Sequence, residues 1–352
     1  MKNKTNRVDH FGGDYSRRKF LQASALVAGG ASLGLPLFGD ARAAGKIVWY
    51  SGASARSIEG WAEMFKKLSG TETETFRTGG VKLAQKFEAE VKAGQVACSV
   101  IDSSLPGIMM EWVERGLMEP YESPESKNYP DEVRDPGYWA PIKSLMLVLT
   151  YNADMVKAAD APRSWEDILH PKWKDKMVMA DAAYSGAALH WFASLRKAYG
   201  KSFMQKLAKQ NVLIKQGSGA TANTVTSGER PLSPMNLHYR AFAAIGKGAN
   251  LQVVIPEEGI PVSYMVIGVP KAAPNLAGGK AFVDFALSKD AQTYWQTKFN
   301  TPSLRKDVEP LSKVRGRRPL SEVKLIHSGR SDIKEFHTQQ AMLLDEWNTL
   351  FK

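Results

Sequence analysis

Four short segments of this chain combine hydroxyl side chains with glycine, or with a second hydroxyl, where strands are expected to end. They are Ser51-Gly52, Thr78-Gly79-Gly80, Ser103-Ser104 and Ser185-Gly186, and each precedes a predicted helix. The first turn of a helix has unpaired N–H groups and a partial positive charge, so such loops suit an anion. Each loop alone is also an ordinary helix cap. The candidate ligand-binding residues are therefore Ser51, Thr78, Gly79, Gly80, Ser103, Ser104, Ser185 and Gly186.

A histidine–tyrosine pair, His238-Tyr239, is the other candidate for the site. The pair is followed by Arg240 and stands beside a predicted lobe boundary, although simple packing in the core is an equal alternative. Arg56, Arg77 and Arg240 are candidate partners for an anionic group, since guanidinium binds phosphate and carboxylate with two parallel hydrogen bonds. Each of these arginines also suits the protein surface.

Catalytic motifs are absent from the sequence. It contains no G-x-S-x-G, H-E-x-x-H, Walker loop or paired C-x-x-C. The single cysteine, Cys98, stands in an apolar segment that predicts a buried strand, so a core thiol is expected rather than a nucleophile. We expect no enzymatic activity, no cofactor and no resident metal.

An alternation of strands and helices is expected to position these loops. In the first part, strands over 46–50 and 99–102 alternate with helices over 57–68 and 83–91, which predicts an α/β domain with a largely parallel sheet. An apolar strand over 145–151 is expected to cross into a second lobe with a long helix over 185–199. In open α/β sheets, ligands bind beyond the carboxyl ends of the strands, where the candidate loops lie.

The first 43 residues predict an export signal. Ser16-Arg17-Arg18-Lys19-Phe20-Leu21 precedes an apolar run from Ala23 to Phe38, and Ala41-Arg42-Ala43 offers a cleavage site. The paired arginines indicate the twin-arginine route. The run is shorter than the ~20 residues that span a bilayer, and a permanent anchor helix is the alternative. We expect the mature protein to begin near Ala44 and to work in a bacterial periplasm.

The chain carries a formal net charge of +11. The predicted signal contains seven Lys/Arg and three Asp, so the remainder still carries +7. This excess favours an anionic ligand. Arg315-Gly316-Arg317-Arg318 resembles a basic patch but has no aromatic residues around it, so a solvated face is expected, with no nucleic-acid partner.

Several longer stretches carry a resemblance to a known family. They include Val48-Trp49-Tyr50-Ser51-Gly52, Tyr151-Asn152, the Ser164–Leu169 segment and Pro171-Lys172-Trp173-Lys174. On these stretches the chain resembles the periplasmic solute-binding proteins of ABC importers, in the group similar to ferric-ion, phosphonate, sugar-phosphate and polyamine binders. The resemblance implies a type II two-lobe α/β fold that closes over its solute like a hinged clamp. It implies a signal over 1–43, a first lobe over 44–148, a second lobe over 149–259, and a return to the first lobe with C-terminal helices over 260–352.

The sequence departs from the ferric-ion binders of that group. The ferric-ion binders share a pattern with two adjacent tyrosines, often with a histidine after the first strand and a glutamate near the second helix. Here the pair is His238-Tyr239, the first strand is followed by Ala53, and Lys82 stands in place of the glutamate. Phenolate and carboxylate oxygens suit Fe(III), whereas a lysine repels it.

We therefore expect a monomeric receptor for a small organic anion bearing a phosphate, phosphonate, sulfonate or carboxylate group, which it delivers to a membrane permease. The organic part is expected to pack on Trp49, Tyr50 or Tyr151, unless these side chains form the core. The alternative within the family is a ferric-ion binder that uses Tyr239 and His238 with a synergistic anion. A periplasmic enzyme and a sensory subunit are alternatives from other classes.

Overall fold

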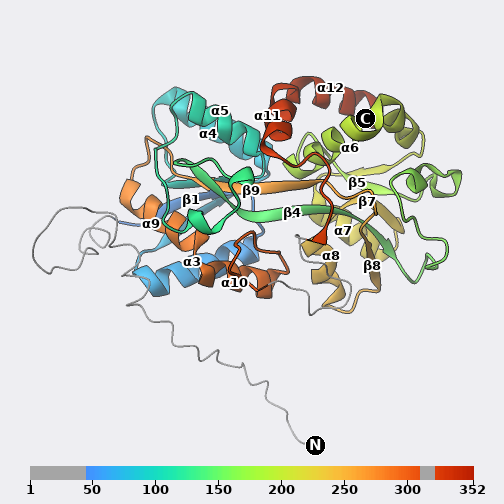
Figure 1. The fold of residues 1–352 in the computed structure, drawn as a ribbon, viewed down its shortest axis with the longest axis horizontal. Helices are drawn as coiled ribbons and strands as arrows, with labels where there is room; N and C mark the ends of the chain where they lie inside the picture. Colours follow the sequence, from blue (N-terminus) through green and yellow to red (C-terminus); the bar gives the residue numbers. More distant parts are fainter. Residues whose placement is uncertain (1–44, 310–321) are drawn as a thin grey trace, which may run out of the picture.

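The computed structural model describes residues 45–309 and 322–352. Figure 1 shows two lobes side by side, with strand β4 running through both of them. The predicted two-lobe α/β architecture is confirmed. The predicted signal over 1–43 and the basic run Arg315–Arg318 lie outside the described residues. Within the described part of the chain, no helix has the length and apolar character needed to cross a membrane.

The first lobe is built on a mixed sheet with the strand order β2-β1-β3-β9-β4. Strand β1 pairs in parallel with β2 and β3, whereas β9 pairs antiparallel with β3 and with the first half of β4. The expectation of a largely parallel sheet is therefore wrong, because the chain leaves this lobe along β4 and returns along β9 in the opposite direction. The elements of this lobe are β1 (Ile47–Ser51), α3 (Ala55–Ser69), β2 (Thr73–Arg77), α4 (Gly80–Ala93), β3 (Val100–Ser103), α5 (Pro106–Glu114), β9 (Val262–Gly268), α9 (Leu276–Leu287) and α10 (Lys289–Phe299).

Apolar residues at helical spacing place α3 on this sheet. Ile58, Trp61 and Phe65 share one face of the helix and are buried, as the spacing predicts. The helix ends at Gly70, whose φ of 79° is left-handed and whose N–H donates to the carbonyl of Lys66. Together with aromatic side chains from β1, α9 and α10, these residues form one hydrophobic core of the first lobe.

The second lobe consists of β7 and β8, which pair antiparallel with the second half of β4, and a separate parallel pair, β5-β6. The long helix predicted over 185–199 forms the first part of α6, which breaks at Gly200 (φ 81°, ψ 173°) and continues to Ala208. The elements of this lobe are β5 (Val178–Ala180), α6 (Gly186–Ala208), β6 (Leu213–Lys215), α7 (Ser218–Ser227), β7 (Leu232–Leu237), α8 (His238–Ile245) and β8 (Leu251–Val254).

Two adjacent crossings join the lobes. Strand β4 (Trp139–Asn152) pairs with β9 as far as Met146 and with β7 from Leu147 onward. The second crossing approaches the first at the same level, since Leu147 N–H donates to the carbonyl of Pro261 at 3.1 Å. Both crossings are extended backbone and lie side by side, which is the arrangement expected of a hinge between two lobes.

The C-terminal helices contact both lobes. Helix α11 (Arg330–Thr338) packs on α5 of the first lobe, and α12 (Gln340–Phe351) packs on α6 of the second. His337 Nε2 lies 2.8 Å from Glu111 Oε2 on α5, and Arg196 Nε on α6 donates to Glu346 at 2.7 Å. The predicted return over 260–352 thus places β9, α9 and α10 in the first lobe, whereas α12 lies against the second lobe (Figure 1). The three-part division stays a prediction.

Candidate functional site

A cavity of about 280 Å³ lies between the two lobes. Its volume is near the lower end of the range for small-molecule sites, so it suits a compact solute. The first lobe contributes Gly52, Arg77, Thr78, Gly79, Gly80, Ser104, Leu145 and Met265 to its lining. The second lobe contributes Tyr184, Ser185, Ala187, Gln216, Gly217, Ser218, Gly219, Ala220, Leu237, Tyr239 and Arg240.

Besides α8, helices α4 and α7 begin at lining residues of this cavity, and α6 begins directly after Ser185. The first residues of α4 and α7 are Gly80 and Ser218. Ser185 caps α6, and its hydroxyl accepts a hydrogen bond from the N–H of Ala188 at 3.4 Å. Helices α4, α6 and α7 have ten or more residues each, so their first turns bring partial positive charge from both lobes to the same space.

Two arginines add full positive charge from opposite sides. Arg77 ends β2 in the first lobe, and Arg240 is in the first turn of α8 in the second lobe. The Arg240 guanidinium lies against Gly219 of α7, and its Nε is buried without a hydrogen-bond partner among the described residues. Among the residues that the structure describes, no aspartate or glutamate lines the cavity. The site is therefore electropositive, and at least one of its hydrogen-bond donors, Arg240 Nε, is unsatisfied within the described ranges.

A lysine that the sequence reasoning missed lies beneath this lining. Lys143 is 2% exposed, and its Nζ lies 3.4 Å from the centre of the Tyr239 ring. Burial lowers the pKa of Lys143. Burial alone would raise the pKa of Tyr239, but the neighbouring Lys143 and Arg240 outweigh it, so the pKa of Tyr239 is lowered. The phenol oxygen of Tyr239 is thus held in a cationic environment.

Asp102, at 0% exposure, anchors the first-lobe loop from below. Its carboxylate accepts hydrogen bonds from Gly52 N–H and from Trp49 Nε1, both at 2.9 Å. Burial raises the pKa of Asp102 to about 6, while the bonds from Ser51, Gly52 and Trp49 act in the opposite direction. The carboxylate fixes the turn after β1 and lies near the charge of Lys143.

The sequence comparison decides which family this fold and site belong to. Residues 99–316, more than half of the chain, match the model of the bacterial extracellular solute-binding protein family. The chain belongs to this family. Such a solute-binding protein is the periplasmic substrate-binding component of an ABC transporter and delivers a small solute to a membrane permease.

Individual relatives of this solute-binding protein differ in the solutes that their names state. A putative 2-aminoethylphosphonate-binding periplasmic protein of Salmonella typhimurium is 25% identical, over 70% of this chain and 74% of its own. The periplasmic binding protein AfuA of Actinobacillus pleuropneumoniae, solved with fructose-6-phosphate bound, superposes with a TM-score of 0.78 at 23% identity, over 87% of this chain and 98% of its own. Iron-bound HitA of Pseudomonas aeruginosa superposes with a TM-score of 0.76 at 19% identity, over 86% and 99%. The two structures show a shared fold.

The structure brings six of the ten predicted site residues of this solute-binding protein to one cavity. They are Thr78, Gly79, Gly80, Ser104, Ser185 and Tyr239. The other four do not line it. Ser51 and Ser103 are buried in the first lobe, where Ser51 Oγ accepts from Ala53 N–H and Ser103 Oγ accepts from Leu105 N–H. Gly186 contacts Leu105, and the His238 ring packs 4.6 Å from Phe242, centre to centre.

Several lining residues escaped the sequence reasoning. The Gln216–Ala220 segment runs from the end of β6 into the first turn of α7. It has the same glycine and hydroxyl pattern as the loops that were predicted, so the pattern was sufficient to find it. Tyr184 stands directly before the predicted Ser185-Gly186 loop. Lys143 lies inside the long apolar strand β4 and gave no signal of its own. Of the three candidate arginines, Arg77 and Arg240 line the cavity, and Arg56 is exposed elsewhere on α3.

Side chains that commonly bind metal ions are dispersed over the described part of the chain. In residues 45–309 and 322–352, no group of three or more histidine, cysteine, aspartate or glutamate side chains is arranged to hold a metal. Cys98 is fully buried, and burial raises the pKa of its thiol above the usual range, which suits the predicted core role.

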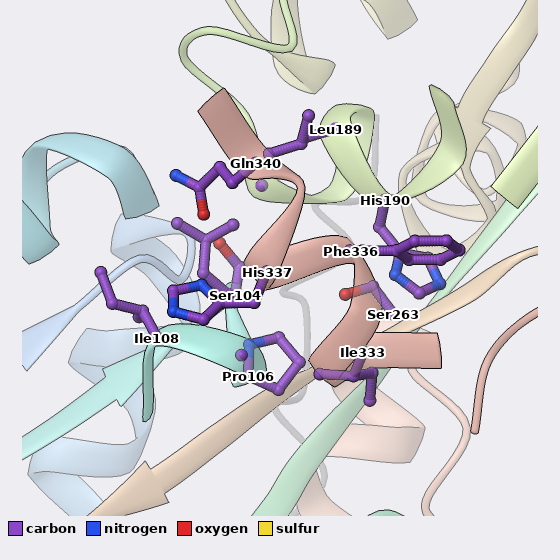
Figure 2. Close-up of a pocket in the computed structure, with 13 residues that line it drawn as sticks. Ser104, Pro106, Ile108, Leu189, His190, Ser263, Ile333, Phe336, His337 and Gln340 are labelled. Carbon is purple, nitrogen blue, oxygen red and sulfur yellow. The ribbon is translucent and has the colours of Figure 1, made fainter. Parts of the chain in front are cut away.

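A second, much smaller cavity of about 30 Å³ shares Ser104 with the first in its lining, and Figure 2 shows the residues around it. It is formed where the start of α5, the start of α6, β9 and the C-terminal helices meet. Figure 2 shows His190 and Ser263 on one side of it and His337 and Gln340 on another. Ser263 Oγ and His190 Nε2 are buried and have no hydrogen-bond partner among the described residues. Burial lowers the pKa of His190 to about 4, so the ring is neutral near pH 7.

Proposed function

We propose that this solute-binding protein captures a small organic anion that bears a phosphate, phosphonate, sulfonate or carboxylate group. The observation that carries the proposal is a cavity with Arg77 and Arg240 on opposite lobes and no carboxylate in its lining. The buried, unpaired Nε of Arg240 requires an acceptor, and an anionic oxygen provides one. We further propose that the mature protein is exported by the twin-arginine route, acts as a monomer and has no enzymatic activity.

The geometry explains how the two lobes would share one anion. Arg77, Thr78 and the first turn of α4 approach from the first lobe, and Ser185, Arg240 and the first turn of α7 approach from the second. Closure about the two crossings excludes water. Charge-assisted hydrogen bonds then act in a medium of lower dielectric constant, where they are stronger. An anion thus stabilises the closed arrangement by bonding to both halves at once.

The names of the relatives support this proposal. The Salmonella relative is described as a 2-aminoethylphosphonate binder, and AfuA was solved with a sugar phosphate. Both solutes combine an anionic phosphorus group with a short polar organic part. The cavity of about 280 Å³ is of a size for such molecules.

Fe(III) with a synergistic anion is the alternative that the iron-bound relative supports. Tyr239 lines the cavity and its pKa is lowered, as a phenolate ligand requires. His238, the second ligand of that hypothesis, packs against Phe242 and does not line the cavity. Lys143 and Arg240 beside Tyr239 would oppose a trivalent cation. The site therefore favours the anion.

Native mass spectrometry of the mature protein, extracted gently from periplasm and accompanied by a visible spectrum, tests the solute class. The expected result is a colourless protein that carries a small organic anion. A coloured protein with the added mass of iron would overturn the proposal and indicate an Fe(III)–tyrosinate site.

Titration calorimetry then tests the residues. The probes are 2-aminoethylphosphonate, fructose-6-phosphate and inorganic phosphate, and the variant is Arg240→Gln. Loss of one hydrogen-bonded charge costs about 1.5–3 kcal/mol, so we expect the dissociation constant to rise by roughly 10- to 150-fold. Arg56→Gln, an exposed arginine outside the cavity, is the matched control and should bind as the wild type does. Equal effects of the two substitutions would contradict the proposed role of Arg240.

A further inference from the structure

The loop between β5 and α6 holds an aromatic side chain across the cleft. Tyr184 belongs to the second lobe and lines the solute cavity. Its backbone is fixed by a turn at Asp181, whose carbonyl accepts from Tyr184 N–H at 3.1 Å and from Ser185 N–H at 2.9 Å. Asp181 is in turn bonded by Trp347 Nε1 at 3.1 Å. These hydrogen bonds hold the backbone that bears the Tyr184 ring.

The ring lies against two glycines, one from each lobe. A Cβ atom placed on Gly79 of the first lobe would lie 2.8 Å from Tyr184 Cζ, closer than real side chains approach. A Cβ atom on Gly217 of the second lobe would lie 3.3 Å from Tyr184 Cε1. We call the space between these two glycines the glycine notch.

The backbone does not demand glycine at either position. Gly79 has φ −65° and ψ 148°, and Gly217 has φ −162° and ψ 171°, which are conformations that any residue adopts. The lack of a side chain is required only by the approach of the Tyr184 ring. The glycine notch therefore fits this ring. Because Gly79 belongs to the first lobe and Tyr184 to the second, the ring contacts Gly79 only when the lobes are closed.

The other aromatic residues expected to contact the solute lie in the core. Trp49 is 0% exposed, Tyr50 is 3% exposed and Tyr151 is 6% exposed, and none of them lines the cavity. The rings that do line it are Tyr184 and Tyr239. Tyr239 packs on the buried Lys143, whereas Tyr184 lies between Gly79 of the first lobe and Gly217 of the second. Tyr184 is therefore the ring at the junction between the lobes.

We infer that Tyr184 is the residue that retains the solute, by seating in the glycine notch when the lobes close. The inference rests on the proposed anion-receptor function and adds the element that sets how slowly the anion leaves. The solute cannot leave until the ring separates from Gly79, so removal of the ring acts mainly on the dissociation rate. The charged groups that attract the anion are unchanged, so the association rate is little affected.

Stopped-flow measurement with the probes named above tests this inference. Tyr184→Ala is expected to raise the dissociation rate by about 10-fold or more, because the substitution removes an aromatic ring from a closed interface. Tyr184→Phe keeps the ring and should stay within about 2-fold of the wild type. Gly79→Ala fills the notch from the opposite lobe and should raise the dissociation rate as well. A dissociation rate for Tyr184→Ala equal to that of the wild type would overturn the inference.

A second measurement separates this inference from the proposed solute class. Cysteines introduced at the exposed Lys92 on α4 and Lys201 on α6 carry a fluorophore pair, while the buried Cys98 stays unlabelled. Tyr184→Ala should lower the energy transfer between the lobes relative to the wild type. If none of the probes binds to the wild type, the proposed solutes are wrong; the comparison is then made on protein extracted gently from periplasm with its own solute bound, and it still decides the role of Tyr184. Equal transfer in the variant and the wild type would overturn that role.

Discussion

Gly186 is the first residue of α6. Adding one methyl group at this position should hinder closure of the lobes without hindering folding. A Cβ atom there would lie 2.6 Å from Leu105 Cδ2 and 2.9 Å from the carbonyl oxygen of Ser104. Leu105 and Ser104 belong to the first lobe, and Gly186 belongs to the second. Gly186→Ala therefore creates a clash between the lobes, part of it with backbone, and the three atoms nearest to the new methyl group beyond its own helix all belong to the first lobe. We expect it to weaken solute binding without destabilising the protein.

The size of the effect follows from two opposing contributions. Overpacking a tight contact by one methyl group costs about 1–3 kcal/mol. Here that cost falls on the closed state alone, so the dissociation constant should rise by roughly 5- to 150-fold. In the open state alanine replaces glycine in a helix, which favours the folded chain by up to about 1 kcal/mol. The melting temperature of the solute-free protein should therefore stay the same or rise slightly.

Gly279→Ala is the matched control. Gly279 is in the first turns of α9, and a Cβ atom there would lie 2.2 Å from the carbonyl oxygen of Ser99. Both residues belong to the first lobe, so the clash is present whether the lobes are open or closed. This variant should lower the melting temperature of the solute-free protein. Once folded, it should bind the probe within about 2-fold of the wild type.

Two assays are sufficient: titration calorimetry with a bound probe, and thermal unfolding of both variants without solute. The reasoning fails if Gly186→Ala binds as tightly as the wild type, because the contact with Leu105 would then be absent from the bound state. It also fails if Gly186→Ala lowers the solute-free melting temperature as much as Gly279→Ala does. In that case the contact would already be part of the solute-free fold.

Three further predictions concern stability. Trp347 is fully buried against Phe192 and joins α12 to the second lobe, so Trp347→Ala should lower the free energy of unfolding by about 3–5 kcal/mol in urea denaturation. Burial raises the pKa of Asp102 from 3.8 to about 6, so the native state holds this proton more tightly than the unfolded chain does. The free energy of unfolding therefore falls as the pH rises from about 4 to about 6, and Asp102→Asn should lose this pH dependence. Burial lowers the pKa of His190 from 6.5 to about 4, so stability falls as the pH drops through that window; His190→Gln should lose that fall, and an unchanged pH profile would contradict the assignment.

The prediction of the loops that meet at the cavity between the lobes rested on local signals. A strand that ends in a hydroxyl and glycine pair before a helix is recognisable from residue types alone, because the cap and the glycine act within a few residues. Thr78, Ser104 and Ser185 were found in this way, and the structure brings them to one cavity. The same signal was present in Gln216–Ala220 and was overlooked.

The pair His238-Tyr239 shows where local reasoning stops. Adjacent residues at the start of a helix point about 100° apart, so the position of one side chain at a cavity does not place its neighbour there. The sequence left both open as ligands. The docking of α8 on β4 and β8 turns Tyr239 toward the cavity and His238 toward Phe242.

Residue types and spacing were enough to predict the family, the two-lobe α/β architecture and the buried face of α3. They also indicated most of the loops that line the cavity between the lobes, because capping, periodicity and glycine placement act at short range. The tertiary structure alone decided the antiparallel path of β4 and β9, the burial of Lys143 beneath Tyr239, and the approach of Tyr184 to Gly79. Each of these depends on segments that are far apart in the chain and meet only when the lobes are assembled. Such contacts leave no periodic trace in the residues that make them.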